Sequence, residues 1–242
     1  MKFYALADRN FKEIYRDPVT LLLGLVMPVT LLILFSSIYK NVRLEMFSPQ
    51  YLTPGIIIFC FAFLLMFSAI LLAKDRQSAF LIRLFTTPLK PSGFILAYII
   101  PFIPLALCQA IICLVVGFIL GATFVNIIGA ILLFLFFALS CISLGIILGS
   151  LFSVNQVSGI GSVLITVISL FSGAWMDLRM IGGVFNTIGY ALPFAHAVDA
   201  SKGLMSGSGF WDISVSFYII TVYTVILFLF AIVSFRRAMK RI

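Results

Sequence analysis

Six long apolar stretches divide the chain, and short polar or charged segments separate them. A helix that spans a membrane needs about 20 apolar residues. The stretches of about this length cover residues 19–39, 55–73, 94–120, 125–152, 157–176 and 213–235. Residues 92–176 contain no charged residue, so the third, fourth and fifth stretches must be joined by very short turns, at 121–124 and 153–156. The pattern predicts six membrane-spanning helices.

Composition supports a membrane protein over a water-soluble one. The 242 residues are 63% hydrophobic and only 10% charged, with a mean hydropathy of +1.23. Soluble domains have about 45–50% apolar and about 25% charged residues. We therefore expect an all-α polytopic membrane protein, with residues 19–242 as a single six-span domain and the first span retained as an anchor. Pro28, Pro101 and Pro104 predict kinks in the spans.

Residues 1–18 have no spanning character and predict a helix that lies at the membrane interface. Asp8 and Lys12, and likewise Arg9 and Glu13, are four residues apart and can pair along its surface. Pro18 is expected to end this helix and to open the first span. One apolar stripe at three- and four-residue steps marks the face that would contact lipid: Phe3, Leu6, Ala7, Phe11 and Ile14.

The basic residues define an orientation. If residues 1–18, residues 74–93 and the C-terminus share one side, twelve of the sixteen lysines and arginines lie there. Because cytoplasmic loops are enriched in lysine and arginine, both termini are expected in the cytoplasm, with the protein in the cytoplasmic membrane of a bacterial cell. Topology thus accounts for the net charge of +8, and we expect no nucleic-acid partner.

The cytoplasmic loop 74–93 is more elaborate than an orientation signal requires. Arg76 and Arg83 are seven residues apart and share one helical face, and apolar residues supply another. This amphipathic, basic pattern is typical of a docking surface for an acidic protein. Helices that rest on anionic lipid headgroups would have the same pattern, and both interpretations remain open.

Four motifs in order along the chain carry a family resemblance. They are YRDP at 15–18, KDRQSAFLIRLFTTPLKPSGFILA at 74–97, FSGAW at 171–175 and YALPFAHAVDASKGLM at 190–205. With this order and topology the chain resembles the ABC-2-type permeases, the membrane subunits of type V ABC exporters.

The resemblance implies a permease without an enzymatic activity of its own. Two permease subunits would pair as a homodimer or heterodimer, and two copies of a cytoplasmic ABC ATPase would dock below them. ATP and Mg²⁺ would bind in that partner, since this chain has no cofactor and no G-x-x-x-x-G-K-[ST] motif. The residues implied in coupling to the ATPase are Lys12, Glu13, Arg16, Lys74, Asp75, Arg76 and Arg83.

The resemblance also implies a substrate path lined by the second and fifth spans. On these spans the candidate residues are Phe59, Phe63, Phe67, Ser162, Thr166 and Ser169. An aromatic wall opposite hydroxyl groups suits a hydrophobic or amphipathic cargo such as a drug, antibiotic, peptide or lipid. A polysaccharide or other glycoconjugate is the alternative cargo, and the phenylalanine stripe could instead face lipid or the helix core.

Small residues predict where helices approach closely. Gly117-x-x-x-Gly121 and Gly145-x-x-x-Gly149 lie on the third and fourth spans, and Gly159 and Gly161 on the fifth. Such spacings favour close helix packing in membranes. Packing within the chain is the preferred interpretation, and a seam between subunits is the alternative.

Residues 177–212 are too polar for a clean span, and the resemblance implies short re-entrant helices that cap the external exit. Pro193, His196 and Asp199 are the candidate cap residues, with His196 and Asp199 expected to form a hydrogen-bonded pair. An intramembrane serine protease built on His196 and Ser208, or a channel or scaffold without a motor, are weaker alternatives. The four cysteines show no metal-ligand spacing, so no metal site is expected.

Overall fold

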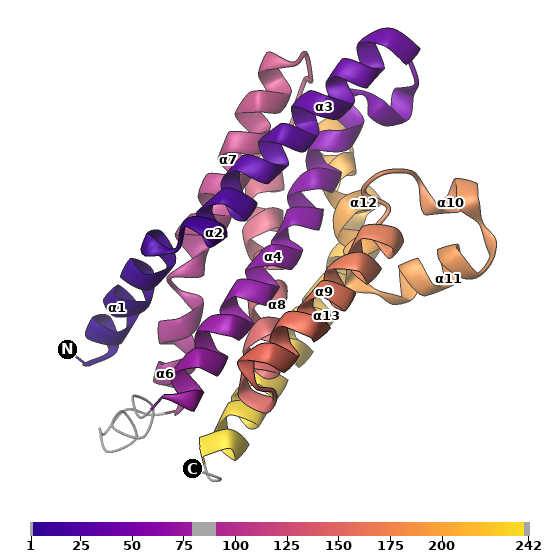
Figure 1. The fold of residues 1–242 in the computed structure, drawn as a ribbon. Helices are drawn as coiled ribbons and strands as arrows, with labels where there is room; N and C mark the ends of the chain where they lie inside the picture. Colours follow the sequence, from indigo (N-terminus) through magenta and orange to yellow (C-terminus); the bar gives the residue numbers. More distant parts are fainter. Residues whose placement is uncertain (1, 79–90, 240–242) are drawn as a thin grey trace.

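The computed structural model describes residues 2–78 and 91–239, and every regular element in these ranges is helical (Figure 1). This confirms the predicted all-α fold with six membrane-spanning helices. The six helical segments that are long and apolar enough to cross a membrane are Pro18–Val42, Pro49–Gln77, Gly93–Ile119, Ile127–Leu151, Val154–Phe171 and Trp211–Ala238.

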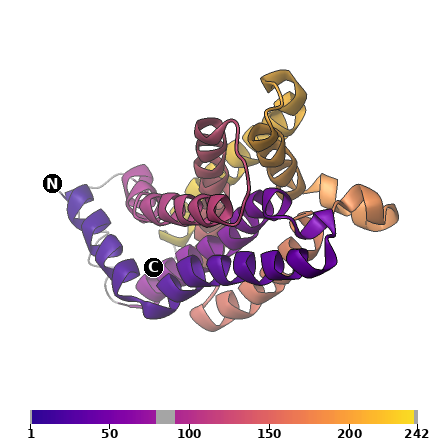
Figure 2. The same cartoon turned by 90° about the horizontal axis from the view of Figure 1, so that it is seen from above.

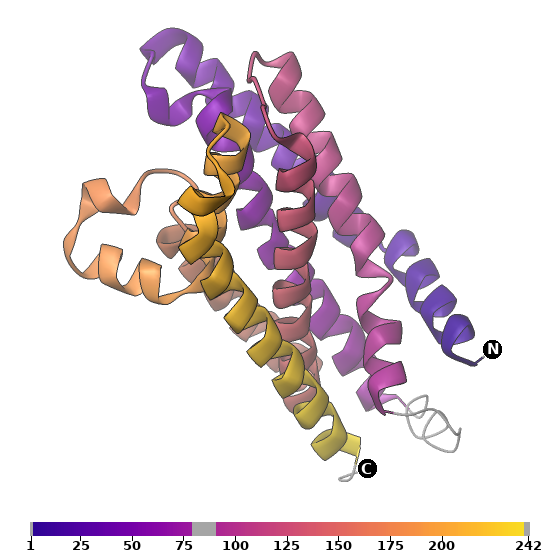
Figure 3. The same cartoon turned by 180° about the vertical axis from the view of Figure 1, so that it is seen from behind.

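The helix ends divide the molecule into two sides. Helix α1 (Lys2–Arg16), the residues that flank 79–90 and the C-terminal end of α13 (Phe210–Met239) lie at one end, which we call the basic end (Figure 1). The turns that join α3 (Met27–Val42) to α4 (Pro49–Gln77) and α7 (Phe102–Ile119) to α8 (Ile127–Leu151) lie at the opposite, distal end (Figures 1 and 3). The described parts of the three segments that sequence analysis placed on one side of the membrane are therefore on one side of the fold.

The first span is continuous but changes its helical geometry. Asp17 caps α2 (Pro18–Leu21): its carboxylate accepts hydrogen bonds from the Val19 amide, at 3.1 Å, and from the Thr20 hydroxyl, at 2.8 Å. A π-helical segment (Leu22–Val26) follows and leads into α3 (Met27–Val42). Pro28 lies just beyond this segment and cannot donate a backbone hydrogen bond, so the wider turn occurs where a kink was predicted. A short 3₁₀ turn (Glu45–Phe47) then leads to the second span.

Helix α4 (Pro49–Gln77) is the centre of the bundle and packs against α3, α7, α8 (Ile127–Leu151), α9 and α12 (Figure 2). Its closest partner is α8, where Gly145 and Gly149 let the two backbones approach. A Cβ atom at Gly145 would lie closer than 3.0 Å to the Leu65 carbonyl oxygen and to the Ser68 hydroxyl. This glycine pair therefore packs within the chain, as preferred from the sequence.

The third span is broken, and the turns that flank α8 are short. Helix α6 (Pro91–Ile99) is separated from α7 (Phe102–Ile119) at Ile100 and Pro101, where the proline removes a backbone donor.

The turn between α8 and α9 (Val154–Phe171) carries a capping box. In it the Ser153 hydroxyl accepts from the Gln156 amide, and the Gln156 side chain accepts from the Ser153 amide.

The last part of the chain leaves the bundle and returns. Helix α9 ends at Phe171, whereas the apolar stretch had predicted a span to residue 176, because Gly173 adopts a positive φ of 70° and turns the chain. Helices α10 (Leu178–Ile181) and α11 (Gly183–Ala191) project sideways, and α12 (Pro193–Ser206) packs back on α4, α8 and α13 (Figures 1 and 3).

Candidate functional site

A buried carboxylate joins three helices at the basic end. Asp75 lies in the last turn of α4 with its side chain only 4% exposed. Its Oδ2 accepts a hydrogen bond of 2.6 Å from the Tyr98 hydroxyl of α6 and forms an ion pair with Arg9 of α1. Beside it, the Asn10 side chain donates to the carbonyl oxygen of Ala97 at 3.0 Å. We call this set of residues the Asp75 joint.

The sequence places α1 against α6 through one face at four-residue spacing. Leu6, Asn10 and Ile14 are all buried on this face. Phe11, which sequence analysis had counted in the apolar stripe, is 45% exposed. Sequence analysis did not place Asn10 on the buried face of α1 because its side chain is polar. Its position four residues from Leu6 and from Ile14 nevertheless indicates that face. The hydrogen bond from its side chain to the Ala97 carbonyl satisfies a buried amide that would otherwise destabilise the fold.

The negative charge of Asp75 is balanced by the positive charge of Arg9. Burial of a carboxylate costs several kcal/mol unless it is paired and hydrogen-bonded. Arg9 supplies the charge and also bonds Glu13, four residues along α1, at 2.5 Å. Partial burial lowers the pKa of Arg9, but the hydrogen bond and charge of Asp75, together with the charge of Glu13, outweigh it and raise this pKa above its ordinary value. The guanidinium therefore stays charged.

The next residue of α4 fastens a fourth helix. The Arg76 guanidinium donates to the carbonyl oxygen of Ser150 and, at 2.7 Å, to that of Phe152. These carbonyls lie at the C-terminal end of α8, where helical backbone oxygens lack partners and carry partial negative charge. Asp75 and Arg76 therefore tie α1, α6 and α8 to the end of α4 that adjoins residues 79–90.

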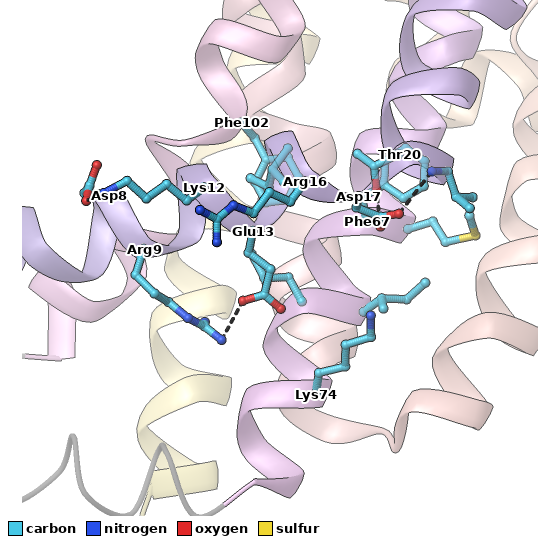
Figure 4. Close-up of a pocket in the computed structure, with 15 residues that line it drawn as sticks. Asp8, Arg9, Lys12, Glu13, Arg16, Asp17, Thr20, Phe67, Lys74 and Phe102 are labelled. Atoms are coloured by element: carbon cyan, nitrogen blue, oxygen red, sulfur yellow. Dashed lines mark hydrogen bonds and ion pairs between the residues drawn. The ribbon is translucent and has the colours of Figure 1, made fainter.

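Other residues predicted to couple to an ATPase surround one cavity next to this joint. The cavity has a volume of about 800 Å³ and lies between the N-terminal helices and α4 (Figure 4). Lys12, Glu13, Arg16 and Lys74 line it, whereas Asp75 and Arg76 are held within the bundle. Arg83 lies outside the described residues.

The predicted substrate-path residues lie on different faces. Phe59, Phe63 and Phe67 form a continuous row on α4, with ring centroids 6.0 and 6.3 Å apart, and all three are buried. Phe59 also contacts the Trp175 ring at 5.2 Å, and Trp175 in turn contacts Phe35. The aromatic row therefore forms part of the packing between α4, α3 and the segment after α9.

The hydroxyl groups lie on α9. Ser162 and Thr166 are exposed, and each donates to the carbonyl oxygen four residues before it, at 2.9 and 3.0 Å. Ser169 accepts a hydrogen bond of 3.0 Å from the Trp175 indole. Ser169 is therefore linked through Trp175 to the aromatic row, and the other two hydroxyls face away from the bundle.

The residues of the predicted external cap have a different hydrogen-bond pattern from the predicted one. Asp199 accepts from the Tyr190 hydroxyl at 2.5 Å and from Arg179 at 3.0 Å. His196 bonds the backbone oxygen of Tyr190, at 3.0 Å, and the hydroxyl of Ser216, at 3.3 Å. The predicted His196–Asp199 pair is thus wrong, because α12 turns His196 toward α13 and Asp199 toward α10 and α11. Burial and the bond to Asp199 both raise the pKa of Tyr190.

A partly buried lysine in α12 was missed by sequence analysis. Lys202 lies 3.4 Å from the centre of the Tyr51 ring and donates to the Gly173 carbonyl at 3.3 Å, so it links α12 to α4 and to the turn after α9. Burial lowers its pKa to about 8, although Asp199 and Asp177 oppose this shift. A single lysine in a polar segment gave no sign of this position. Pro193, a predicted cap residue, opens the same helix at its first turn.

Lys202 predicts a pH dependence of stability. Its pKa is lowered from 10.5 in the unfolded chain to about 8 in the folded protein, so folding disfavours the charged form. Stability should therefore increase as the pH rises from about 8 to about 10.5, and Lys202→Met should remove this increment. Thermal unfolding of both proteins in detergent across this range would measure it, and equal pH profiles would contradict it.

The fold and the comparisons with known proteins define the class of protein to which the chain belongs. Six apolar helices, of which α4 is the central one, make the chain a multi-pass membrane protein. The family model for ABC-2 type transporters matches residues 1–206, and the chain belongs to this family.

Named relatives agree with the family. The chain is 34% identical over 90 residues to the transport permease ycf38 of Porphyra purpurea and 32% identical over 94 residues to that of Cyanophora paradoxa. These alignments cover 35% and 37% of this chain and 31% and 32% of the relatives, so the chain matches only about a third of their length. The daunorubicin resistance ABC transporter permease protein DrrB1 of Streptomyces coeruleorubidus is 23% identical over 204 residues, which cover 81% of this chain and 72% of that protein.

Proposed function

We propose that the chain is the permease subunit of an ATP-driven exporter and that a separate ABC ATPase moves it from the basic end. Membership of the ABC-2 family supports this role. The observation that carries the proposal is the Asp75 joint, which fastens the amphipathic helix α1 to α4 and α6 beside residues 79–90. A force applied to α1 or to this loop would reach the central span directly.

In this proposal the residues at the basic end have two roles. The exposed side chains of Lys12, Arg16 and Lys74, with Glu13, contact the ATPase. Asp75 and Arg76 instead hold the helices together, so that the contact moves them as one unit. Arg83 is proposed for the same ATPase contact. ATP and Mg²⁺ bind in two copies of the ATPase, because the sequence of this chain has no P-loop motif.

The proposed cargo is hydrophobic or amphipathic: a drug, an antibiotic, a peptide or a lipid. The family and the drug-resistance relative support this class. Two permease subunits, identical or different, would pair and enclose the path. The exposed hydroxyls of Ser162 and Thr166 on α9 would then face the second subunit, and the aromatic row of α4 would lie behind them. The proposed location is the cytoplasmic membrane of a bacterial cell, with both termini in the cytoplasm.

Charge reversal at exposed positions tests the ATPase contact. Lys12→Glu with Arg16→Glu should lower co-purification of the ATPase subunit by roughly tenfold, because two favourable contacts become repulsive. Both side chains are exposed, so the membrane yield of the permease should not change. Co-expression and affinity capture of the tagged permease would measure the bound ATPase.

Arg236→Glu with Arg237→Glu is the matched control, because these exposed arginines lie at the same end of the molecule on α13. The control should retain the ATPase. Equal retention of the ATPase by both double variants would overturn the proposed contact.

A further inference from the structure

The cavity at the basic end combines an apolar wall with a charged rim. Its volume is about 800 Å³, and α1, α2, α4 and α7 surround it (Figure 4). Met66, Phe67 and Ile70 of α4 supply the wall, together with Phe102 of α7. The charged side chains come from α1 and from Lys74 at the end of α4. Because α4 is a spanning helix, the wall lies toward the membrane interior and the rim toward the basic surface.

The carboxylates of the rim already have cationic or hydrogen-bonding partners. Asp8 forms an ion pair with Lys12 at 2.6 Å, and Glu13 forms one with Arg9 at 2.5 Å. Asp17 accepts hydrogen bonds from the first amide and the hydroxyl of α2. Asp8 and Glu13 are therefore neutralised by cations of α1, and both oxygens of Asp17 are engaged by neutral donors of α2.

Two cations of the rim are not neutralised in this way. Arg16 ends α1 and Lys74 lies in the last turns of α4, and both side chains are exposed. Among residues 2–78 and 91–239, neither side chain has a hydrogen-bond or ion-pair partner. In Figure 4 the Lys74 ammonium extends from α4 toward Asp17, whereas the Arg16 guanidinium lies on the other side of the cavity, toward Lys12. Within the described part of the chain, the cavity thus has two positive charges without an ion-pair partner above an apolar wall.

We propose that this cavity binds a phosphate-bearing amphiphile, with the phosphate between Arg16 and Lys74 and an acyl chain along the wall of Met66, Phe67 and Ile70. A guanidinium and an ammonium both bind phosphate oxygens well, and each basic residue near a membrane surface attracts an anionic lipid by about 1 kcal/mol. An apolar wall adds attraction only for a ligand with a hydrocarbon chain. The occupant is therefore an anionic phospholipid of the adjacent leaflet, and not a soluble phosphate.

Competition binding distinguishes these two sources of phosphate. The probe is a fluorescently labelled short-chain phosphatidylglycerol, and its anisotropy is measured with the full-length chain in a non-ionic detergent. Unlabelled short-chain phosphatidylglycerol should displace the probe, whereas short-chain phosphatidylcholine and inorganic phosphate at the same concentration should not. Displacement by inorganic phosphate as effective as that by phosphatidylglycerol would overturn the lipid assignment.

Substitutions locate the site. Arg16→Gln with Lys74→Gln should weaken probe binding by about 25-fold, since each lost charge accounts for about fivefold. Lys74→Arg should retain binding, and Ile70→Gln should weaken it without a change in charge. Arg236→Gln with Arg237→Gln removes two charges at the same end, outside the cavity, and should leave the affinity unchanged.

Equal affinities for the two double variants would overturn the site, since attraction to the basic surface as a whole would then explain binding. Circular dichroism and size exclusion of each variant would establish that it is folded. Arg16 and Lys74 are also proposed for the ATPase contact, but this measurement uses no ATPase, so lipid binding can fail or succeed separately from that contact.

Discussion

Gly145→Ala should sharply reduce the stability of the protein, whereas Gly159→Ala should leave it unchanged. A methyl group at Gly145 would lie closer than 3.0 Å to the carbonyl oxygen of Leu65, which is backbone and cannot rotate away. Relief requires α8 to move from α4, which is the largest helix interface in the bundle. Overpacking of a tight core costs about 1–3 kcal/mol and sometimes more, and we expect the upper end here.

The control, Gly159→Ala, makes the same chemical change as Gly145→Ala in different surroundings. Gly159 lies in α9, and a methyl group there would meet nothing within 4 Å. Both changes add one methyl group to a glycine in a spanning helix, so helix propensity acts alike at both sites. Membrane yield and the thermal midpoint of the purified proteins would measure the difference. Similar midpoints for both variants would mean that the close contact between α4 and α8 is not tight.

Hydrophobic pattern and proline positions were enough to predict most of the fold. Six apolar stretches predicted six spanning helices, and Pro28 and Pro101 predicted the places where helical geometry changes. These features depend on local chemistry, since a span needs continuous apolar length and proline removes a backbone donor. The predicted end of the fifth span, residue 176, was wrong: α9 ends at Phe171 because Gly173, and not a charge, turns the chain.

The sequence predicted the charged neighbourhood of the site but not its connections. Asp75 and Arg76 were expected at the ATPase surface, yet their side chains bond α1, α6 and α8. Such partners are far away in sequence, and the periodicity within one helix does not indicate them. Tyr98 was missed for the same reason, since a tyrosine in an apolar span has no local sign of a buried carboxylate nearby.

Asp75→Asn should separate ATP hydrolysis from transport. The amide keeps the shape of the side chain but removes the charge that pairs with Arg9. Loss of one member of a buried pair costs about 3–5 kcal/mol, and the lower value applies because Arg9 is 35% exposed and still bonds Glu13. The joint between α1 and α4 should therefore loosen while the exposed surface proposed to bind the ATPase stays intact.

Two further variants isolate the joint. Asp8→Asn removes a carboxylate from an exposed pair on the same helix α1, and it should cost less than about 1 kcal/mol. Arg9→Gln combined with Asp75→Asn should cost less than the sum of the two single changes, because both remove the same interaction. Additive costs would mean that Arg9 and Asp75 do not act as a pair.

The most direct measurement uses inverted vesicles that contain the permease with or without its ATPase subunit. ATP-dependent uptake of fluorescent amphipathic dyes and ATP hydrolysis are recorded together. We expect uptake only when the ATPase is present, full hydrolysis and uptake with Asp8→Asn, and sustained hydrolysis with at least tenfold lower uptake with Asp75→Asn. Uptake by the permease alone, or unchanged uptake with Asp75→Asn, would contradict a permease moved by a separate ATPase through the Asp75 joint.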